Sequence, residues 1–221
     1  MDKAQTFSVT LTGINPAIVH NDNLVWANKV KLWQDNPTNK RSSIPGDDRC
    51  PSWRWIGYIY NDGKYLTIDS DNLMTMLREG GSKVPTGKGT QTFKSITQSG
   101  MIINEIGWPI VGPKGPVKLD DIMALVDEPD FTVHEATAVK LGFRLFPKHA
   151  KIGTKKHIRV RPVFDTWSVS GTIMVIDPRI NISVVENILA QAGAFCGLCD
   201  WRPSSPKAGR FGTFSAEVKK I

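Results

Sequence analysis

The chain has 221 residues, of which 40% are hydrophobic and 22% charged, and its formal net charge is +7. This length suits one large domain with a substantial core, and the composition excludes a disordered or low-complexity chain. No apolar run approaches the ~20 residues that a membrane-spanning helix needs, and the first residues show no signal-peptide pattern. We therefore expect a single domain over residues 1–221, located in the cytoplasm and without a membrane partner.

The three cysteines are too few and too unevenly spaced for a disulfide framework, which fits a reducing compartment. Cys196 and Cys199 straddle the end of a predicted helix, where the helix dipole raises the pKa of a thiol instead of activating it. A zinc site would need two further ligands, and only Cys50 and four scattered histidines remain. We interpret the cysteines as structural, with a zinc half-site as the alternative, and expect no bound metal and no cofactor.

The first predicted strand covers residues 5–14, where Phe7, Val9 and Leu11 alternate with polar residues until Gly13 interrupts the pattern. From residue 15 to 48 the signals are weaker, and only residues 24–33 predict a short helix. The next aromatic cluster, Trp53 to Tyr60, fits either core packing or a platform on which bases stack.

The chain from residue 61 to 130 alternates between turns, short strands and short helices. The stretch Ser82–Thr90 resembles a phosphate-binding loop, but it lacks the first glycine and the final Ser or Thr of a Walker motif. In chain order we predict a turn at 61–64, a strand at 65–68, a helix capped by Asp69 or Ser70 that ends at Gly80-Gly81, a helix at 91–98, a strand at 101–105, a loop at 108–116 and a helix at 119–126.

The stretch from residue 136 to 164 contains no acidic residue and gives the chain its basic character. Without its eight cations the rest of the chain would carry a formal charge of −1. These cations are Lys140, Arg144, Lys148, Lys151, Lys155, Lys156, Arg159 and Arg161. The basicity is therefore local, as expected of a surface that meets a polyanion.

The end of this basic stretch shows the alternation of a strand, because Ile158 and Val160 separate three cationic positions, His157, Arg159 and Arg161. A second alternating run follows at residues 166–175. We predict that these two runs pair as antiparallel strands, and that residues 146–156 form a mobile basic loop before them.

The last helix is predicted to open with the capping box Ser183–Glu186 and to end at Gly197. Its apolar stripe comprises Ile182, Val185, Ile188, Leu189, Ala192 and Phe195. Trp201 follows directly, and we expect its ring to lie trapped between this helix and the sheet. A glycine-rich loop with Arg210 and Phe211 precedes a final strand that reaches Val218.

This order of elements is typical of an α+β fold with a ferredoxin-like or RNA-recognition-type core. The core would come from residues 1–20 and 131–221, and residues 21–130 would be a large insertion after the first strand.

A row of cations beside Ser and Thr hydroxyls favours contact with the phosphates of a single-stranded nucleic acid. The alternatives are a basic edge strand that prevents aggregation, or contact with an anionic membrane. The glycine-rich loop at Gly209–Gly212 fits either contact with a ligand or packing against the rest of the fold. The candidate binding residues are Lys148, Lys151, Lys155, Lys156, His157, Arg159, Arg161, Arg202, Arg210 and Phe211.

The chain resembles an uncharacterised family of phage and prophage proteins in three places: Gly13–Asn21, Arg161–Trp167, and Asp200–Pro203 together with Gly209–Gly212. Cys199 stands where that family has glycine. More remotely, the element order and the glycine-rich loop are similar to the RAMP superfamily, which includes the repeating backbone subunit of CRISPR effector complexes. That subunit binds single-stranded nucleic acid along a helical oligomer, so the resemblance implies a self-assembling strand-binding protein without a catalytic residue.

We therefore expect a non-enzymatic protein that binds single-stranded DNA or RNA as a homo-oligomer, in phage replication, recombination or counter-defence in the host cytoplasm. One alternative is a metal-dependent nuclease, whose carboxylates would be Asp120, Asp121 and Glu135. Another is a phage structural or inhibitory protein whose basic face meets an acidic protein partner.

Overall fold

A computed structural model describes residues 4–41, 50–152 and 155–221, with the side chains of residues 40–41 and 149–158 excepted. The fold is α+β, and all of the strand pairings in the described residues are antiparallel. The α+β class predicted from the sequence is therefore confirmed. None of the described helices is long and apolar enough to cross a bilayer.

The largest sheet is built around β1 (Gln5–Gly13), which pairs with β11 (Ser168–Val175) and β12 (Phe214–Lys220). Alternate residues of β1, such as Phe7 and Leu11, are fully buried, because successive side chains of a strand point to opposite faces. Beyond β11 the sheet continues with β5 (Met101–Ile102), β7 (Val111–Gly112) and β8 (Gly115–Pro116). Residues 101–102, 111–112 and 115–116 thus belong to the same sheet as the first strand.

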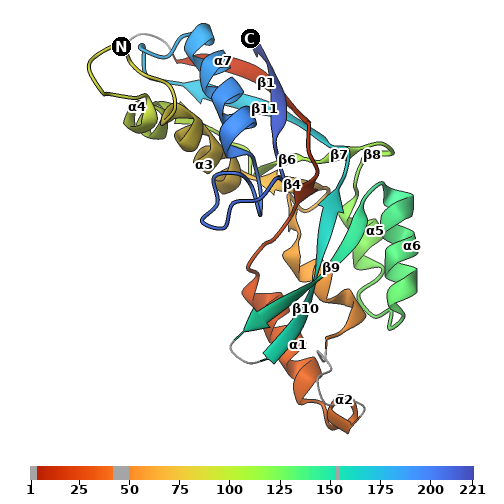
Figure 1. The fold of residues 1–221 in the computed structure, drawn as a ribbon. Helices are drawn as coiled ribbons and strands as arrows, with labels where there is room; N and C mark the ends of the chain where they lie inside the picture. The colour runs from red at the N-terminus through yellow and green to blue at the C-terminus, as the bar shows by residue number, and fades with distance from the viewer. Residues whose placement is uncertain (1–3, 42–49, 153–154) are drawn as a thin grey trace.

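The helices α3 (Ser70–Gly81), α4 (Lys94–Gly100) and α7 (Ile182–Gln191) cover this sheet in the upper part of Figure 1. Asp69 caps α3, as predicted, by accepting a hydrogen bond from the amide of Asp71. The backbones of α3 and α7 lie so close that a Cβ on Gly80 would be 2.5 Å from the carbonyl oxygen of Ile188.

The start of α7 differs from the prediction. Asn181 caps the helix through the amide of Val184, so the expected capping box at Ser183 does not form. The helix continues into a π-helical turn, η2 (Ala192–Cys196), and ends at Gly197 with φ 73°, as predicted. The wider π turn changes which face points inward, and Phe195 is 59% exposed instead of completing the buried stripe.

A second region combines the sheet β3 (Tyr60–Asn61), β4 (Leu66–Asp69) and β6 (Gly107–Pro109) with the short helices η1 (Ser52–Tyr58) and α5 (Leu119–Met123). The predicted loop at 108–116 therefore contains strand residues. Trp55 is fully buried, which confirms core packing for this part of the aromatic cluster. It donates a hydrogen bond to His134 on α6 (Phe131–Leu141), a helix that the sequence analysis missed.

The basic stretch forms a third sheet, β2–β10–β9, made of β2 (Ala17–Ile18), β10 (Lys155–Phe164) and β9 (Arg144–Ile152). Two predictions are corrected here. Most of the expected loop at 146–156 is strand, and β10 pairs with β9 rather than with β11. After Phe164 the chain crosses to the largest sheet, where the amide of Gly13 donates a hydrogen bond to the carbonyl of Trp167.

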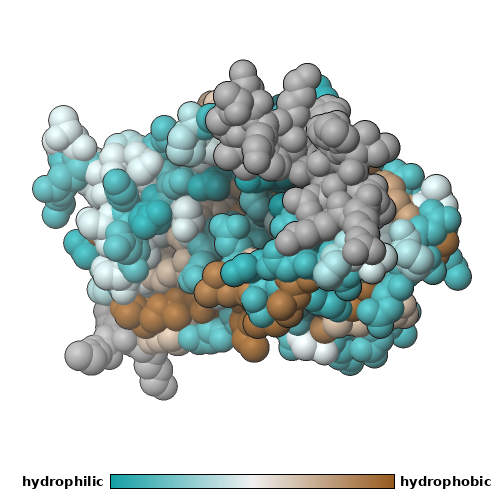
Figure 2. All heavy atoms as spheres, turned by 90° about the horizontal axis from the view of Figure 1, so that it is seen from below, coloured by the Kyte–Doolittle hydropathy of each residue, from teal (hydrophilic) through white to brown (hydrophobic). Residues whose placement is uncertain are grey.

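The hairpin β9–β10 lies in the lower part of Figure 1, with α1 (Leu24–Asp35) and α2 (Pro37–Arg41) at the same end. The predicted helix at 24–33 is confirmed and extends to Asp35. Figure 2, which views the molecule from below, shows a band of hydrophobic residues across a largely hydrophilic surface. On α1, the apolar side chains of Leu24, Val25 and Leu32 are exposed.

Candidate nucleic-acid interface

The register of the hairpin places three of the predicted cations on one face. Lys148 pairs with Arg159, and Phe146 pairs with Arg161. Directly opposite residues share a face, as do residues two apart along a strand, so Lys148, Arg159 and Arg161 form one row. The other face contains the buried Leu145 and Phe164, which pack into the core. The hairpin is therefore anchored by Leu145 and Phe164, and Lys148, Arg159 and Arg161 lie on the opposite face.

The loop from Leu198 to Gly212 lies against this cationic face and has a constrained backbone. Cys199 and Trp201 both have positive φ angles, 63° and 52°, which cost a non-glycine residue on the order of 1 kcal/mol or more each. The amide of Asp200, between them, donates to the carbonyl of Ile18 on β2. A Cβ on Gly212 would lie only 1.9 Å from the carbonyl oxygen of Leu198, so this crossing requires glycine.

The constrained loop directs the ring of Trp201 toward the hairpin. Lys148 Nζ lies 3.2 Å from the ring centroid and Arg161 Cζ lies 5.5 Å from it. The Phe211 ring is 6.1 Å away at an interplanar angle of 31°. Trp201 is only half-buried, so it does not occupy the expected position between the last helix and the sheet. The Trp201 ring instead pairs with the Phe211 ring and contacts the cations Lys148 and Arg161 of the hairpin.

An ionic network holds the loop to the hairpin. Arg161 donates to Asp200 Oδ2, and His20 Nδ1 lies 3.6 Å from the same oxygen. The amide of Trp201 donates to the other carboxylate oxygen at 2.9 Å. Burial alone would raise the pKa of Asp200, but hydrogen bonding from His20, the charge of Arg161 and the Trp201 amide hold that pKa below its usual value.

Arg161 keeps one unused donor despite this network. Its side chain is 12% exposed, and its Nε is buried without a hydrogen-bond partner among the described residues. Buried polar groups are nearly always paired in native proteins, so this buried Nε is an exception among the described residues.

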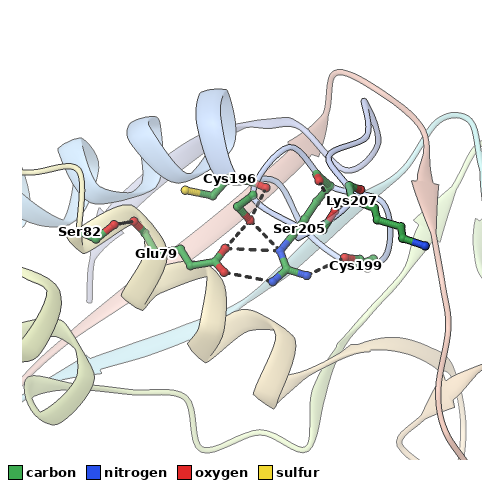
Figure 3. Close-up of polar contacts among 8 residues, drawn as sticks. Glu79, Ser82, Cys196, Cys199, Ser205 and Lys207 are labelled. Atoms are coloured by element: carbon green, nitrogen blue, oxygen red, sulfur yellow. Dashed lines mark hydrogen bonds and ion pairs between the residues drawn. The ribbon is translucent and has the colours of Figure 1, made fainter.

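Arg202 and Arg210, the predicted cations of the loop, have different surroundings. Arg202 Nη2 lies 3.1 Å from Glu79 of α3, and Nη1 donates to the carbonyl of Cys199. Figure 3 shows Glu79 reaching from its helix into this cluster of polar contacts. The charge of Arg202 is thus neutralised within the fold. Arg210 is exposed, with Cζ 6.0 Å from the Phe211 ring.

The structure thus brings together Lys148, Arg159, Arg161 and Phe211 of the predicted residues. The side chains of Lys151, Lys155, Lys156 and His157 lie outside what the structure describes. Sequence reasoning predicted that Trp201 is a buried anchor, and offered a stacking role only as the alternative for an exposed ring. Its distances to Lys148 and Arg161 show that the ring faces the hairpin.

The two cysteines beside this site are buried and unsuited to nucleophilic chemistry. Burial raises the pKa of the Cys199 thiol to about 12, and burial together with Glu79 raises the pKa of Cys196. Both thiols are free. Among the described residues, no group of three or more His, Cys, Asp or Glu side chains could hold a metal ion. Asp120 and Asp121 on α5 and Glu135 on α6 are exposed.

Comparison with models of known protein families finds no match for this chain, and a comparison with curated proteins finds no significantly similar sequence.

Proposed function

We propose that the protein binds single-stranded nucleic acid on the face formed by the hairpin β9–β10 and the loop Leu198–Gly212. The observation that carries this proposal is the half-buried Trp201 ring, which has Lys148 over it and Phe211 and Arg161 close to it. Cations that track phosphates beside aromatic rings that stack on bases are the combination that single-strand binding uses. Duplex DNA would not offer its bases to such a surface.

Binding would change the partner of Lys148. In the free protein its ammonium group covers one side of the Trp201 ring. A base that stacks there must displace it, and the displaced ammonium then lies next to the phosphate that follows the base. The exchange replaces a cation–π contact by a charge-assisted phosphate contact, and so costs the protein little.

The fold supports the same proposal. We infer a ferredoxin-like core of the RNA-recognition type, made of β1, β5, β11 and β12 in the order β12–β1–β11–β5. Of the helices that lie in the chain between β1 and β5, α3 would be the core helix, and α7 lies between β11 and β12. In sequence, the hairpin β9–β10 is then an insertion between β5 and β11, the second and third strands of this core. On this proposal the protein assembles along the strand in the cytoplasm of a phage host.

The test compares two lysine variants in titrations of a fluorescein-labelled 12-nucleotide single strand at several salt concentrations. For four or five phosphate contacts, we expect a log–log slope of about −3 in the wild type. Lys148→Ala should weaken binding and make the slope shallower by about 0.7, because one phosphate contact is lost. Lys140→Ala, which removes an exposed charge on α6, is the matched control and should leave the slope unchanged.

A wild-type slope near zero, or equal effects of the two substitutions, would contradict the proposal. Incubation of the same strands with magnesium, with and without EDTA, distinguishes a metal-dependent nuclease, since only a nuclease would shorten them. If no strand binds at low salt, the basic face belongs instead to an acidic protein partner.

A further inference from the structure

A pocket of about 360 Å³ opens next to the cationic face, between α1, η1 and β10. Its polar lining includes Arg54 and Arg159, and its apolar lining includes Leu24, Trp26 and Tyr58. Arg159 belongs to the hairpin row described above, so the pocket and the proposed binding face share a side chain. The volume lies at the lower end of the ~300–1,000 Å³ that small-molecule sites occupy.

The pocket also connects to the Trp201 site through His20. This residue lines the pocket, lies 3.6 Å from Asp200 of the loop, and meets the Tyr58 ring edge-on at 4.7 Å. A strand that follows the row Arg161–Arg159 away from Trp201 therefore passes the mouth of the pocket. The two sites are adjacent positions along one path.

The charges of the lining favour an anion on the hairpin side. Among the described residues of the lining, Arg54 and Arg159 carry positive charge and Asp22 carries negative charge. The Asp22 side chain is 98% exposed and lies 3.7 Å from His20 Nε2, so it stands at the rim and not in the depth of the pocket. A phosphate is thus expected beside Arg159, and an uncharged planar group deeper in the pocket.

The aromatic wall is held rigidly. Trp26 packs on Trp53 with ring centroids 5.7 Å apart, and Lys29 Nζ lies over both rings. Gly57 allows α1 to lie directly on η1, since a Cβ there would be 2.7 Å from Trp26 Cβ. A preformed wall of this kind loses little freedom when a planar ligand packs against it.

We propose that this pocket takes a single nucleotide, with its base against the Trp26 wall and its phosphate on Arg159. The inference rests on the proposed strand binding: one base of the bound strand leaves the stack and enters the pocket. A single strand permits this readily, because the base has no partner to leave. A free mononucleotide carries the same chemistry and is the other source of such a ligand.

The experiment fills the pocket without disturbing the core. Ala27 lines the pocket and is exposed on α1, whereas its neighbour Asn28 is exposed but does not line it. Adjacent helix positions point about 100° apart, so Ala27→Phe occupies the pocket and Asn28→Phe is the matched control. Ala27→Met serves as a second, smaller filling variant. Melting curves establish that each variant is folded.

Each protein is titrated with the labelled 12-nucleotide strand and, separately, with thymidine and deoxyadenosine 5′-monophosphates. We expect Ala27→Phe to weaken strand binding about ten-fold, the loss of one base contact, and Asn28→Phe to bind like the wild type. Strand binding that both Ala27 variants leave unchanged, with no mononucleotide bound, would overturn the pocket proposal and leave the proposed function standing.

The remaining outcomes also decide between the two proposals. Mononucleotide binding that Ala27→Phe abolishes, in a protein that binds no strand, supports the pocket and contradicts the proposed function. If neither ligand binds the wild type, both are wrong.

Discussion

At the scale of single residues, the site depends on one carboxylate that organises two cations. The Asp200 carboxylate accepts hydrogen bonds from Arg161 and from the Trp201 amide, and its Oδ2 lies 3.6 Å from His20 Nδ1. It therefore fixes the loop to the hairpin, but it also neutralises part of the positive charge of the proposed binding face. On our proposal, binding and stability place opposite demands on this residue.

Asp200→Asn should therefore lower the melting temperature at pH 7 and tighten strand binding at low salt. Because the folded-state pKa of Asp200 is lowered, its contribution to stability is present above the ordinary aspartate pKa of about 3.9 and is lost as pH falls through the lower folded value. The free energies of unfolding of wild-type protein and Asp200→Asn, measured by urea titration, should converge as the pH falls below the lowered folded-state pKa of Asp200. A difference that persists unchanged in acid would show that the asparagine perturbs packing instead.

At the scale of elements, local signals predicted what local interactions determine. The first strand, the Asp69 cap of α3 and the Gly197 end of the last helix depend on residues near in sequence, and all three are confirmed. The pairing of β10 was predicted wrongly, because alternation identifies a strand but not its partner. The cations and Pro147 also concealed β9, since they interrupt its apolar alternation.

The beginning of α7 offers a test of the same lesson. The sequence fits a cap at Ser183, but it is Asn181 Oδ1 that accepts a hydrogen bond from the Val184 amide, at 3.0 Å. Asn181→Ala should lower the free energy of unfolding by about 1 kcal/mol, the usual effect of losing a cap. Ser183→Ala should change it by a few tenths at most. Urea denaturation of both variants measures the difference, and a larger loss at Ser183 would restore the sequence-based cap.

At the scale of the whole molecule, the proposed site is an arrangement that no single segment contains. Its cations come from the hairpin and its tryptophan from a loop about forty residues later, and β2 near the start of the chain joins them. The basic stretch could be predicted because the charge of each residue can be counted directly in the sequence. The position of Trp201 against the hairpin could not be predicted, because it depends on two positive φ angles and on a tertiary pairing.

Binding of single strands by wild-type protein, Trp201→Phe and Trp201→Ala tests the central claim most directly. Stacking on one aromatic ring contributes about 1–3 kcal/mol per base, so Trp201→Ala should weaken binding about 5- to 150-fold. Trp201→Phe should retain much of the affinity, and the half-buried ring predicts similar melting temperatures for all three proteins. The account would be contradicted by a Trp201→Ala protein that melts early yet binds the strand as tightly as the wild type.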